Sequence, residues 1–236
     1  MISTIEILFE DDYILIVNKP NNVLIHYSHY ARNIKDATLI DLLESQIGKR
    51  VYPLHRLDRK TSGVIVFTKD KKFIPKFQEL FFNDEIQKTY LGIVRGFSPK
   101  NGTIDTPVKN PDTKQYKDAL TIFETLNSSV LDIPVHPYDQ SRYSLIKLIP
   151  KTGRMHQLRI HLNKISHPLV GDYKYGDRFH NRNFENNFDC HNLFLHAYQL
   201  SFIHPYSNLP IEITAPLNEN WKKMLSVFKW DFDLTD

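Results

Sequence analysis

The sequence VYPLHRLDRKTSGVIVFTK, from Val51 to Lys69, joins a basic turn directly to an apolar run. Three cationic side chains surround a single acid, Asp58. Thr, Ser and Gly follow as turn formers, and residues 64–67 then predict a buried strand. Because nearby positive charge favours the anionic form of an acid, Asp58 is a candidate functional carboxylate. The alternative is an ordinary loop aspartate that accepts hydrogen bonds from local backbone N–H groups.

Positive charge is concentrated around this turn. Residues 49–76 contain nine Lys or Arg and two Asp, whereas the 236-residue chain as a whole has a net charge of +3. Such a basic segment, here called the basic belt, is typical of a surface that contacts phosphates when the rest of the protein is nearly neutral. On charge alone, a solvated face of the protein explains the belt equally well.

The composition is that of a soluble globular protein, with 41% hydrophobic and 24% charged residues. The length suits one large domain or two small ones. Cys190 is the single cysteine, which excludes an internal disulfide or a cysteine-based zinc cluster and favours a reducing compartment. The start has no signal-peptide pattern, and no apolar stretch reaches membrane-spanning length. We therefore expect a cytoplasmic protein with no membrane contact.

The residues before the basic belt predict a β-hairpin, a short strand, a loop and a helix. Two apolar runs separated by acids predict the hairpin strands, at 5–9 and 13–17. Thr38 and Asp41 fit a capping box, and Gly48 ends the helix that the box begins. The intervening short strand and loop are expected at 23–25 and 26–36.

The rest of the chain predicts further helices and strands. Helices are expected at 71–82, from just after Gly153 to about 165, and at 217–228; strands are expected at 86–96, 119–126, 143–149, 192–203 (or a buried helix there) and 211–214. Stretches rich in turn formers or polar residues, at 102–115 and 173–189, are expected to be loops. Residues 127–142 hold two prolines and no periodicity, which indicates an insertion. Without an internal repeat or linker, residues 1–236 are expected to form one domain.

Two further side chains are candidates for a functional site. Tyr90 lies on the more polar face of the predicted strand 86–96, which suits a cleft wall; the alternative is a half-buried strand tyrosine. Arg159 lies at the edge of an apolar helical stripe, so we expect it to be partly buried and to have an anionic partner. We predict Asp58 as that partner; the alternative is an arginine that extends to solvent.

Motifs for several enzyme classes are absent from the sequence. It has no GxxxxGK[ST] phosphate loop and no glycine-rich dinucleotide turn, no zinc deaminase signature, no HExxH and no G-x-S-x-G nucleophile elbow. The histidines show no metal-ligand spacing. The sequence therefore predicts chemistry based on a carboxylate, an arginine and a tyrosine, with no metal and no cofactor.

Three blocks occur in a fixed order: HRLDRKTSGVIVFTK at 55–69, KTYLGIVRG at 88–96 and KTGRMHQLRIHL at 151–162. They resemble the signature blocks of the RluA-type pseudouridine synthases. The flanking stretches ILFEDDYILIVNKPNNVLIH, HPLVGDYKYGD and LFLHAYQLSF match the same family's pattern, so the resemblance covers nearly the whole chain. The stretches QIGKRVYPLHRLDR, FNDEIQKTYLGIVRGF and YKYGDRFHNR are most similar to the TruC-type group, the tRNA pseudouridine-65 synthases.

The resemblance implies the fold and the reaction of that family. The implied fold is α+β, with a mixed, mostly antiparallel sheet bent around a central RNA-binding cleft and with flanking helices. The implied reaction breaks the bond from uracil N1 to the ribose, turns the base and rejoins the sugar to C5. Since this needs no net redox change, the resemblance implies no cofactor and no metal. The implied partner is tRNA, bound by a monomer.

The family's catalytic residues carry over onto matching positions. Asp58 matches the catalytic aspartate, which acts on the sugar either by attack at the anomeric carbon or by removal of the 2′ proton; the sequence leaves both routes open. Arg159 matches the arginine that pairs with this aspartate and keeps it charged. Tyr90 matches the tyrosine that stacks on the target base and assists removal of the C5 proton.

The resemblance also assigns residues to substrate binding. A uracil must leave its stack to reach such a site, and Arg56 matches the residue that fills the resulting gap. The other binding candidates are His55, Arg154, His156, Gln157 and, as an apolar pocket wall, Leu195. Cations of the basic belt would hold the RNA backbone with little sequence choice. Two other functions stay open: an RluA-type synthase acting on ribosomal RNA, and a non-catalytic RNA-binding protein on the same scaffold.

Overall fold

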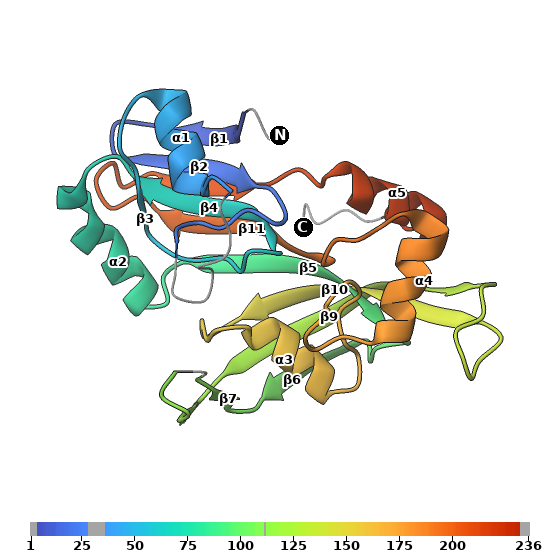
Figure 1. The fold of residues 1–236 in the computed structure, drawn as a ribbon. Helices are drawn as coiled ribbons and strands as arrows, with labels where there is room; N and C mark the ends of the chain where they lie inside the picture. The colour runs from blue at the N-terminus through green and yellow to red at the C-terminus, as the bar shows by residue number, and fades with distance from the viewer. Residues whose placement is uncertain (1–3, 28–35, 111, 232–236) are drawn as a thin grey trace. The chain divides into compact units, whose positions relative to one another are not determined.

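The computed structural model describes residues 4–27, 36–110 and 112–231. Contacts divide the chain into two compact units, of which unit 1 comprises Met1–Lys88 and His196–Pro216, and unit 2 comprises Thr89–Leu195 and Leu217–Asp236. Each unit has its own strands and helices, most of which are labelled in Figure 1. In the described ranges, every helix is too short or too polar to cross a membrane.

Unit 1 is built on a mostly antiparallel sheet with the strand order β1-β2-β4-β11. The strands are β1 Glu6–Glu10, β2 Ile14–Lys19, β4 Ser62–Thr68 and β11 Leu195–Ile203, with β3 Tyr52–Pro53 paired to β4 and β12 Pro210–Thr214 paired to β11. The predicted hairpin is therefore confirmed as β1–β2. The predicted buried strand after the basic turn is confirmed as β4, in which every residue is buried.

Strand β4 meets β11 in the parallel direction, and a glycine makes their close approach possible. Ser62 pairs with His196, and Gly63 pairs with Ala197. Gly63 has a φ of 110°, and a Cβ at this position would lie 2.1 Å from the carbonyl oxygen of Ala197. Only a residue without a side chain fits such a backbone contact. Gly63 thereby allows β4, the strand that directly follows the Asp58 turn, to pair closely with β11.

The described residues of unit 1 also form two α-helices. Helix α1, Leu39–Ile47, begins with the predicted capping box, in which Thr38 and Asp41 hydrogen bond reciprocally, and it ends at Gly48 in the left-handed conformation. The predicted helix at 71–82 is confirmed as α2, Ile74–Phe82, preceded by one 3₁₀ turn at Lys71–Phe73. Apolar side chains of α2, β2 and β4 form one core cluster, including Phe77, Leu80, Ile14, Ile16, Val64 and Val66.

The main strands of unit 2 are antiparallel and pair in the order β5-β10-β9-β6. These strands are β5 Gln87–Arg95, β10 Ser141–Pro150, β9 Leu120–Leu131 and β6 Asn101–Asp105; the short strands β7 Val108–Lys109 and β8 Tyr116–Lys117 pair with each other. Strands β9 and β10 extend into the stretch 127–142, so that residues 132–140 connect them. The predicted α+β class, with mostly antiparallel strands, is confirmed in both units.

In the part of unit 2 that the structure describes, the helices are α3 Gln157–Lys164, α4 Arg178–Phe188 and α5 Glu219–Phe228, of which α4 and α5 are orange and red in Figure 1. One core cluster joins α3 to the sheet and includes Leu158, Leu162, Ile146, Leu148 and Leu195. An aromatic group joins α4 and α5 to the sheet, because Phe184 contacts the rings of Tyr143, Phe194 and Phe228.

Several predicted boundaries differ from the structure. Residues 23–25 form no strand, because the carbonyl groups of Leu24 and Ile25 accept hydrogen bonds from the first residues of α1. The predicted loop 102–115 contains most of β6 and all of β7, and the predicted loop 173–189 contains α4. Helix α3 begins at Gln157, after His156 in the left-handed conformation, and not just after Gly153. Most of the predicted loop 26–36 lies outside the described residues.

Candidate active site

The turn that carries Asp58 in unit 1 is stabilised by hydrogen bonds within the turn and to strand β4. The backbone N–H of Thr61 donates to the carbonyl oxygen of Asp58 at 3.1 Å, which closes the turn. Nε2 of His55 accepts a hydrogen bond from the backbone N–H of Val66 at 3.1 Å. Burial, with a smaller effect from Lys88, lowers the pKa of His55 to about 3, so this ring is neutral at pH 7. His55 therefore anchors the turn to β4; its contact with substrate stays a prediction.

A buried lysine, Lys19, forms hydrogen bonds with the backbone of the same turn. Lys19 is fully buried, and its Nζ donates to the carbonyl oxygens of Pro20 at 2.8 Å and Arg59 at 2.9 Å. Asn21 adds a hydrogen bond from Nδ2 to the carbonyl oxygen of Lys60 at 2.6 Å. Burial lowers the pKa of Lys19 to about 7, although the negative charge of Asp58 opposes this shift. Lys19 was not among the predicted site residues; its place at the end of the apolar run ILIVN is the signal that could have found it.

The pKa of Lys19 gives a prediction about stability and pH. The pKa is lowered from 10.5 to about 7 in the folded protein, so between these values the unfolded chain holds a proton that the native protein has lost. Stability must therefore rise with pH across this window. We expect Lys19→Met to remove this rise, as measured by urea unfolding at about pH 7 and about pH 9.5. The exposed Lys72→Met is the matched control; equal pH dependence in all three proteins would contradict the prediction.

Arg56 and Arg59 give the turn an exposed cationic surface. Both side chains are exposed, and Nε of Arg59 donates to the carbonyl oxygen of Asn22 at 2.9 Å. Burial and the positive charge of Arg56 both lower the pKa of His26, which also lies in unit 1. Asp58 itself is half-buried. Unit 1 thus presents a carboxylate on a rigid turn beside cations that face solvent.

Tyr90 lies on β5 of unit 2, directly across from Leu148 of β10. Its half-buried ring packs against the core cluster that contains Leu148 and Leu195. The structure therefore brings together two of the predicted site residues, Tyr90 and Leu195. Leu195 is buried, with 3% of its surface exposed; its role as an apolar pocket wall stays a prediction.

Arg159 is buried on α3 and has a carboxylate partner within unit 2, as a buried arginine requires. Its Nε and Nη2 donate to the two carboxylate oxygens of Asp172, at 2.7 Å and 2.8 Å. The guanidinium carbon also lies 5.1 Å from the centre of the Tyr175 ring. Asp172 was missed, because it lies in a stretch without periodicity. The pairing of Arg159 with Asp58 joins residues of different units and stays a prediction.

The ion pair changes the titration of Asp172. Burial by itself would raise the pKa of this carboxyl group, but the hydrogen bonds and positive charge of Arg159 outweigh it. The backbone N–H groups of Lys174 and Tyr175 also donate to Oδ1 of Asp172, at 2.9 Å and 3.1 Å. The net effect lowers the pKa of Asp172, so it is ionised at neutral pH and fixes the plane of the guanidinium.

The loop before α3 and the first residue of that helix hold the other predicted binding residues. Gln157 accepts hydrogen bonds from Thr152 Oγ1 at 2.7 Å and the Arg154 N–H at 3.0 Å, and its Nε2 donates to Leu120 and Thr121 of β9 at 3.0 Å each. Its amide therefore fastens the loop to the sheet. Nε of Arg154 donates to the carbonyl oxygen of Asp118 at 2.9 Å. Substrate contacts of these residues stay predictions.

His156 and Arg159 share one neighbour, Tyr175. Nδ1 of His156 lies 2.9 Å from the Tyr175 hydroxyl group, and the Arg159 guanidinium lies over the Tyr175 ring. Unit 2 thus offers a phenol at Tyr90, an oriented guanidinium and a histidine. In the described ranges, no group of three or more His, Cys, Asp or Glu could hold a metal ion. These side chains can position a nucleobase and stabilise an anion.

Comparison with known proteins gives consistent results. A family model described as RNA pseudouridylate synthase matches residues 13–164. The chain is 39% identical to tRNA pseudouridine synthase C of Vibrio cholerae serotype O1 over 240 residues, covering 98% of each chain. It is 38% identical to the protein of the same name from Haemophilus influenzae, covering 96% of this chain and 99% of the other.

Solved structures show the same fold at low sequence identity. The structure titled Human RNA Pseudouridylate Synthase Domain Containing 4 matches with a TM-score of 0.74 and 24% identity, over 96% of this chain and 94% of the other. Human RNA Pseudouridylate Synthase Domain Containing 1 matches with a TM-score of 0.72 and 21% identity, over 99% and 98%. At this identity the likeness concerns the fold alone.

Proposed function

This chain belongs to the RNA pseudouridylate synthase family, and from that premise we propose that it converts the uridine at position 65 of tRNA to pseudouridine. The observation that carries the choice of tRNA is the 39% identity to a tRNA pseudouridine synthase C over 98% of both chains. An RNA pseudouridylate synthase isomerises uridine within RNA. The proposal therefore concerns the RNA, the nucleotide and the residues that act on it.

The reaction defines what the side chains must do. The bond from uracil N1 to ribose C1′ breaks, the base turns, and a bond forms between C5 and C1′. A proton leaves C5, and N1 ends with a proton. Electrons balance without an oxidant or reductant, so the proposal includes no cofactor. The protein must activate the sugar, hold the detached base and move one proton.

We assign the action on the sugar to Asp58. The turn that carries it is closed by the Thr61 N–H and tied to Lys19 through the carbonyl group of Arg59. A catalytic group must be held by a rigid support to act at a defined distance from its target. Attack at C1′ and removal of the 2′ proton both require an ionised carboxylate at this position.

We assign the handling of the base to unit 2. Tyr90 stacks on the uracil and assists removal of the C5 proton, and Leu195 forms an apolar part of the pocket. Arg159 holds Asp58 in its charged state. A guanidinium has five N–H donors, and Asp172 accepts from two of its nitrogen atoms. One guanidinium can therefore serve two carboxylates.

We assign RNA binding in unit 1 to exposed cations. Arg56 fills the gap left by the flipped uridine, since a flat guanidinium can both stack and hydrogen bond. The basic belt contacts backbone phosphates, which contributes affinity but little sequence choice. We place the enzyme in the cytoplasm as a monomer, because a folded tRNA is a complete substrate for one active site.

A mapping experiment tests the proposal. The purified protein is incubated with unmodified tRNA transcripts, and pseudouridine is mapped at single-nucleotide resolution. In parallel, tRNA and rRNA from a deletion strain are mapped. We expect product at tRNA position 65 in vitro and loss of that site alone in the strain. Loss of an rRNA site would favour the rRNA alternative. No product in either experiment would favour a non-catalytic RNA-binding protein.

A further inference from the structure

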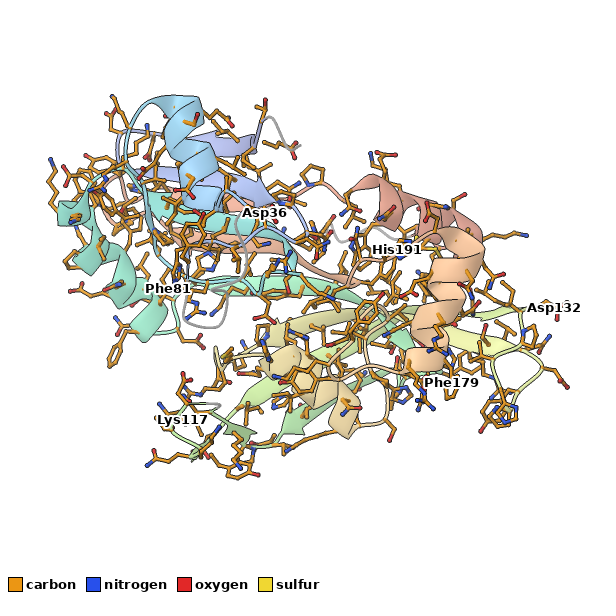
Figure 2. All side chains as sticks on the ribbon, viewed as in Figure 1. Asp36, Phe81, Lys117, Asp132, Phe179 and His191 are labelled. Carbon is orange, nitrogen blue, oxygen red and sulfur yellow. The ribbon has the colours of Figure 1, made fainter. Side chains whose placement is uncertain are left out.

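A cavity of about 210 Å³ lies in unit 2, between the loop after Gly171 and helix α4. The loop contributes Asp172 and Tyr173 to its wall, and the helix contributes Arg178, Asn181, Arg182 and Glu185. The four helical residues occupy positions i, i+3, i+4 and i+7, so they share one face of α4. Phe179, labelled in Figure 2, marks the first turn of this helix. The roles proposed above make no use of this cavity.

The acids around this cavity already have donors. Asp172 is 1% exposed and receives two hydrogen bonds from Arg159. Glu185 accepts a hydrogen bond from the Tyr173 hydroxyl group. Burial, together with Glu185, raises the pKa of Tyr173 to about 12, so Tyr173 remains a donor at neutral pH. Both acids of the wall therefore already accept hydrogen bonds from protein donors.

The two arginines of the wall have no such partners. Among the described residues, neither Arg178 nor Arg182 forms an ion pair with an acid, and both side chains are exposed. They are four positions apart on α4, where two like charges repel each other and destabilise the helix. The lining carries two positive charges, on Arg178 and Arg182, and two negative charges, on Asp172 and Glu185, but only the two acids already have hydrogen-bond partners among the described residues of the protein. This arrangement favours an anion at the mouth of the cavity.

We propose that this cavity binds one backbone phosphate of the RNA substrate, held between Arg178 and Arg182. The inference rests on the proposed function. The guanidinium group matches phosphate oxygens with two parallel N–H donors. The cavity is smaller than the roughly 300–1,000 Å³ typical of sites for whole small molecules, which favours a single phosphate group. The exposed ring of Tyr173 gives the adjacent sugar or base an apolar surface.

The site has a defined role in recognition. A phosphate contact contributes affinity and fixes the orientation of the RNA, but it does not select a sequence. The cavity wall includes Asp172, the partner of Arg159. RNA bound here would therefore contact the same loop that orients the proposed catalytic arginine. Loss of the site should weaken tRNA binding and leave the chemical step unchanged.

The test is the double variant Arg178→Gln/Arg182→Gln in the full-length protein. Binding of unmodified tRNA is measured as Kd over a range of salt concentrations, and KM and kcat are measured for pseudouridine formation. We expect Kd and KM to rise about 5- to 10-fold, and the slope of log K against log salt to fall by about 1. The value of kcat should change less than about twofold.

The control is Lys100→Gln/Lys222→Gln, which removes the same charge from exposed positions elsewhere in unit 2. Its Kd should stay within about twofold of the wild-type value. An unchanged Kd and salt slope in the arginine variant, or an equal change in the control, would overturn the inference. A wild-type protein that binds tRNA but forms no pseudouridine would contradict the proposed function alone, because Kd still tests the phosphate site.

Discussion

Asp58→Asn is expected to form pseudouridine at least about 1,000-fold more slowly than the wild type. Asparagine has the shape of aspartate, but its amide can neither attack the anomeric carbon nor take the 2′ proton. The turn itself should persist, because Thr61 donates to the backbone carbonyl group of residue 58 and not to its side chain. The loss should therefore appear in kcat, with Kd for tRNA within about threefold of the wild-type value.

The matched control for this variant is Asp70→Asn. Asp70 is the other aspartate of the basic belt, and its side chain caps the 3₁₀ turn by accepting from the Lys72 N–H. Asparagine caps a helical turn about as well as aspartate does, so this variant should keep its activity. Single-turnover rates with unmodified tRNA measure both variants. An Asp58→Asn rate above a tenth of the wild-type rate would exclude Asp58 as the group that acts on the sugar.

Asp172→Ala is expected to lower the free energy of unfolding by about 3–5 kcal/mol. The substitution removes the carboxylate that pairs with the buried Arg159 and also accepts from the N–H groups of Lys174 and Tyr175. Removing one member of a buried ion pair leaves the other charge poorly compensated. Urea unfolding at neutral pH measures the change, and the exposed Asp132→Ala should cost less than about 0.5 kcal/mol.

The pH dependence of this effect has a definite sign. The folded protein lowers the pKa of Asp172, whereas in the unfolded chain it is about 3.9. The stabilisation is therefore complete above about pH 4 and is lost as the pH falls through the folded value. We expect the difference between the wild type and Asp172→Ala to shrink in acid. A difference below about 1 kcal/mol at neutral pH would contradict the importance of this ion pair.

A double variant separates stability from catalysis. In Arg159→Met/Asp172→Leu both charges of the pair are replaced by apolar groups, which restores stability in many buried ion pairs. We expect unfolding free energy to recover toward the wild-type value while pseudouridine formation stays low. Recovery of both properties would show that Arg159 has only a structural role.

Local chemistry was enough to predict several elements. The Thr38–Asp41 capping box and Gly48 define both ends of α1, because each contact joins residues within one turn. Strand β4 was predicted because a buried strand needs an uninterrupted apolar run. Such signals depend only on residues that are close in the sequence, so they can be recognised without knowledge of the tertiary structure.

Helix α4 could not be predicted in this way. Its sequence RFHNRNFENNF is rich in Asn, a poor helix former, and has no continuous apolar stripe. The helix is held by Phe184, which contacts Tyr143, Phe194 and Phe228 from distant parts of the chain. Tertiary contacts of this kind override weak local preference.

The sequence by itself determined the family and the candidate residues, because three ordered blocks place Asp58, Tyr90 and Arg159 in recognisable surroundings. It also predicted that Arg159 is partly buried with an anionic partner, but it left open an arginine that extends to solvent. Only the tertiary structure decided that Asp172 is a partner of this arginine and that Lys19 supports the Asp58 turn. Burial and charge pairing depend on distances between side chains in space. The periodicity of a sequence does not indicate which residues far apart in the chain come into contact.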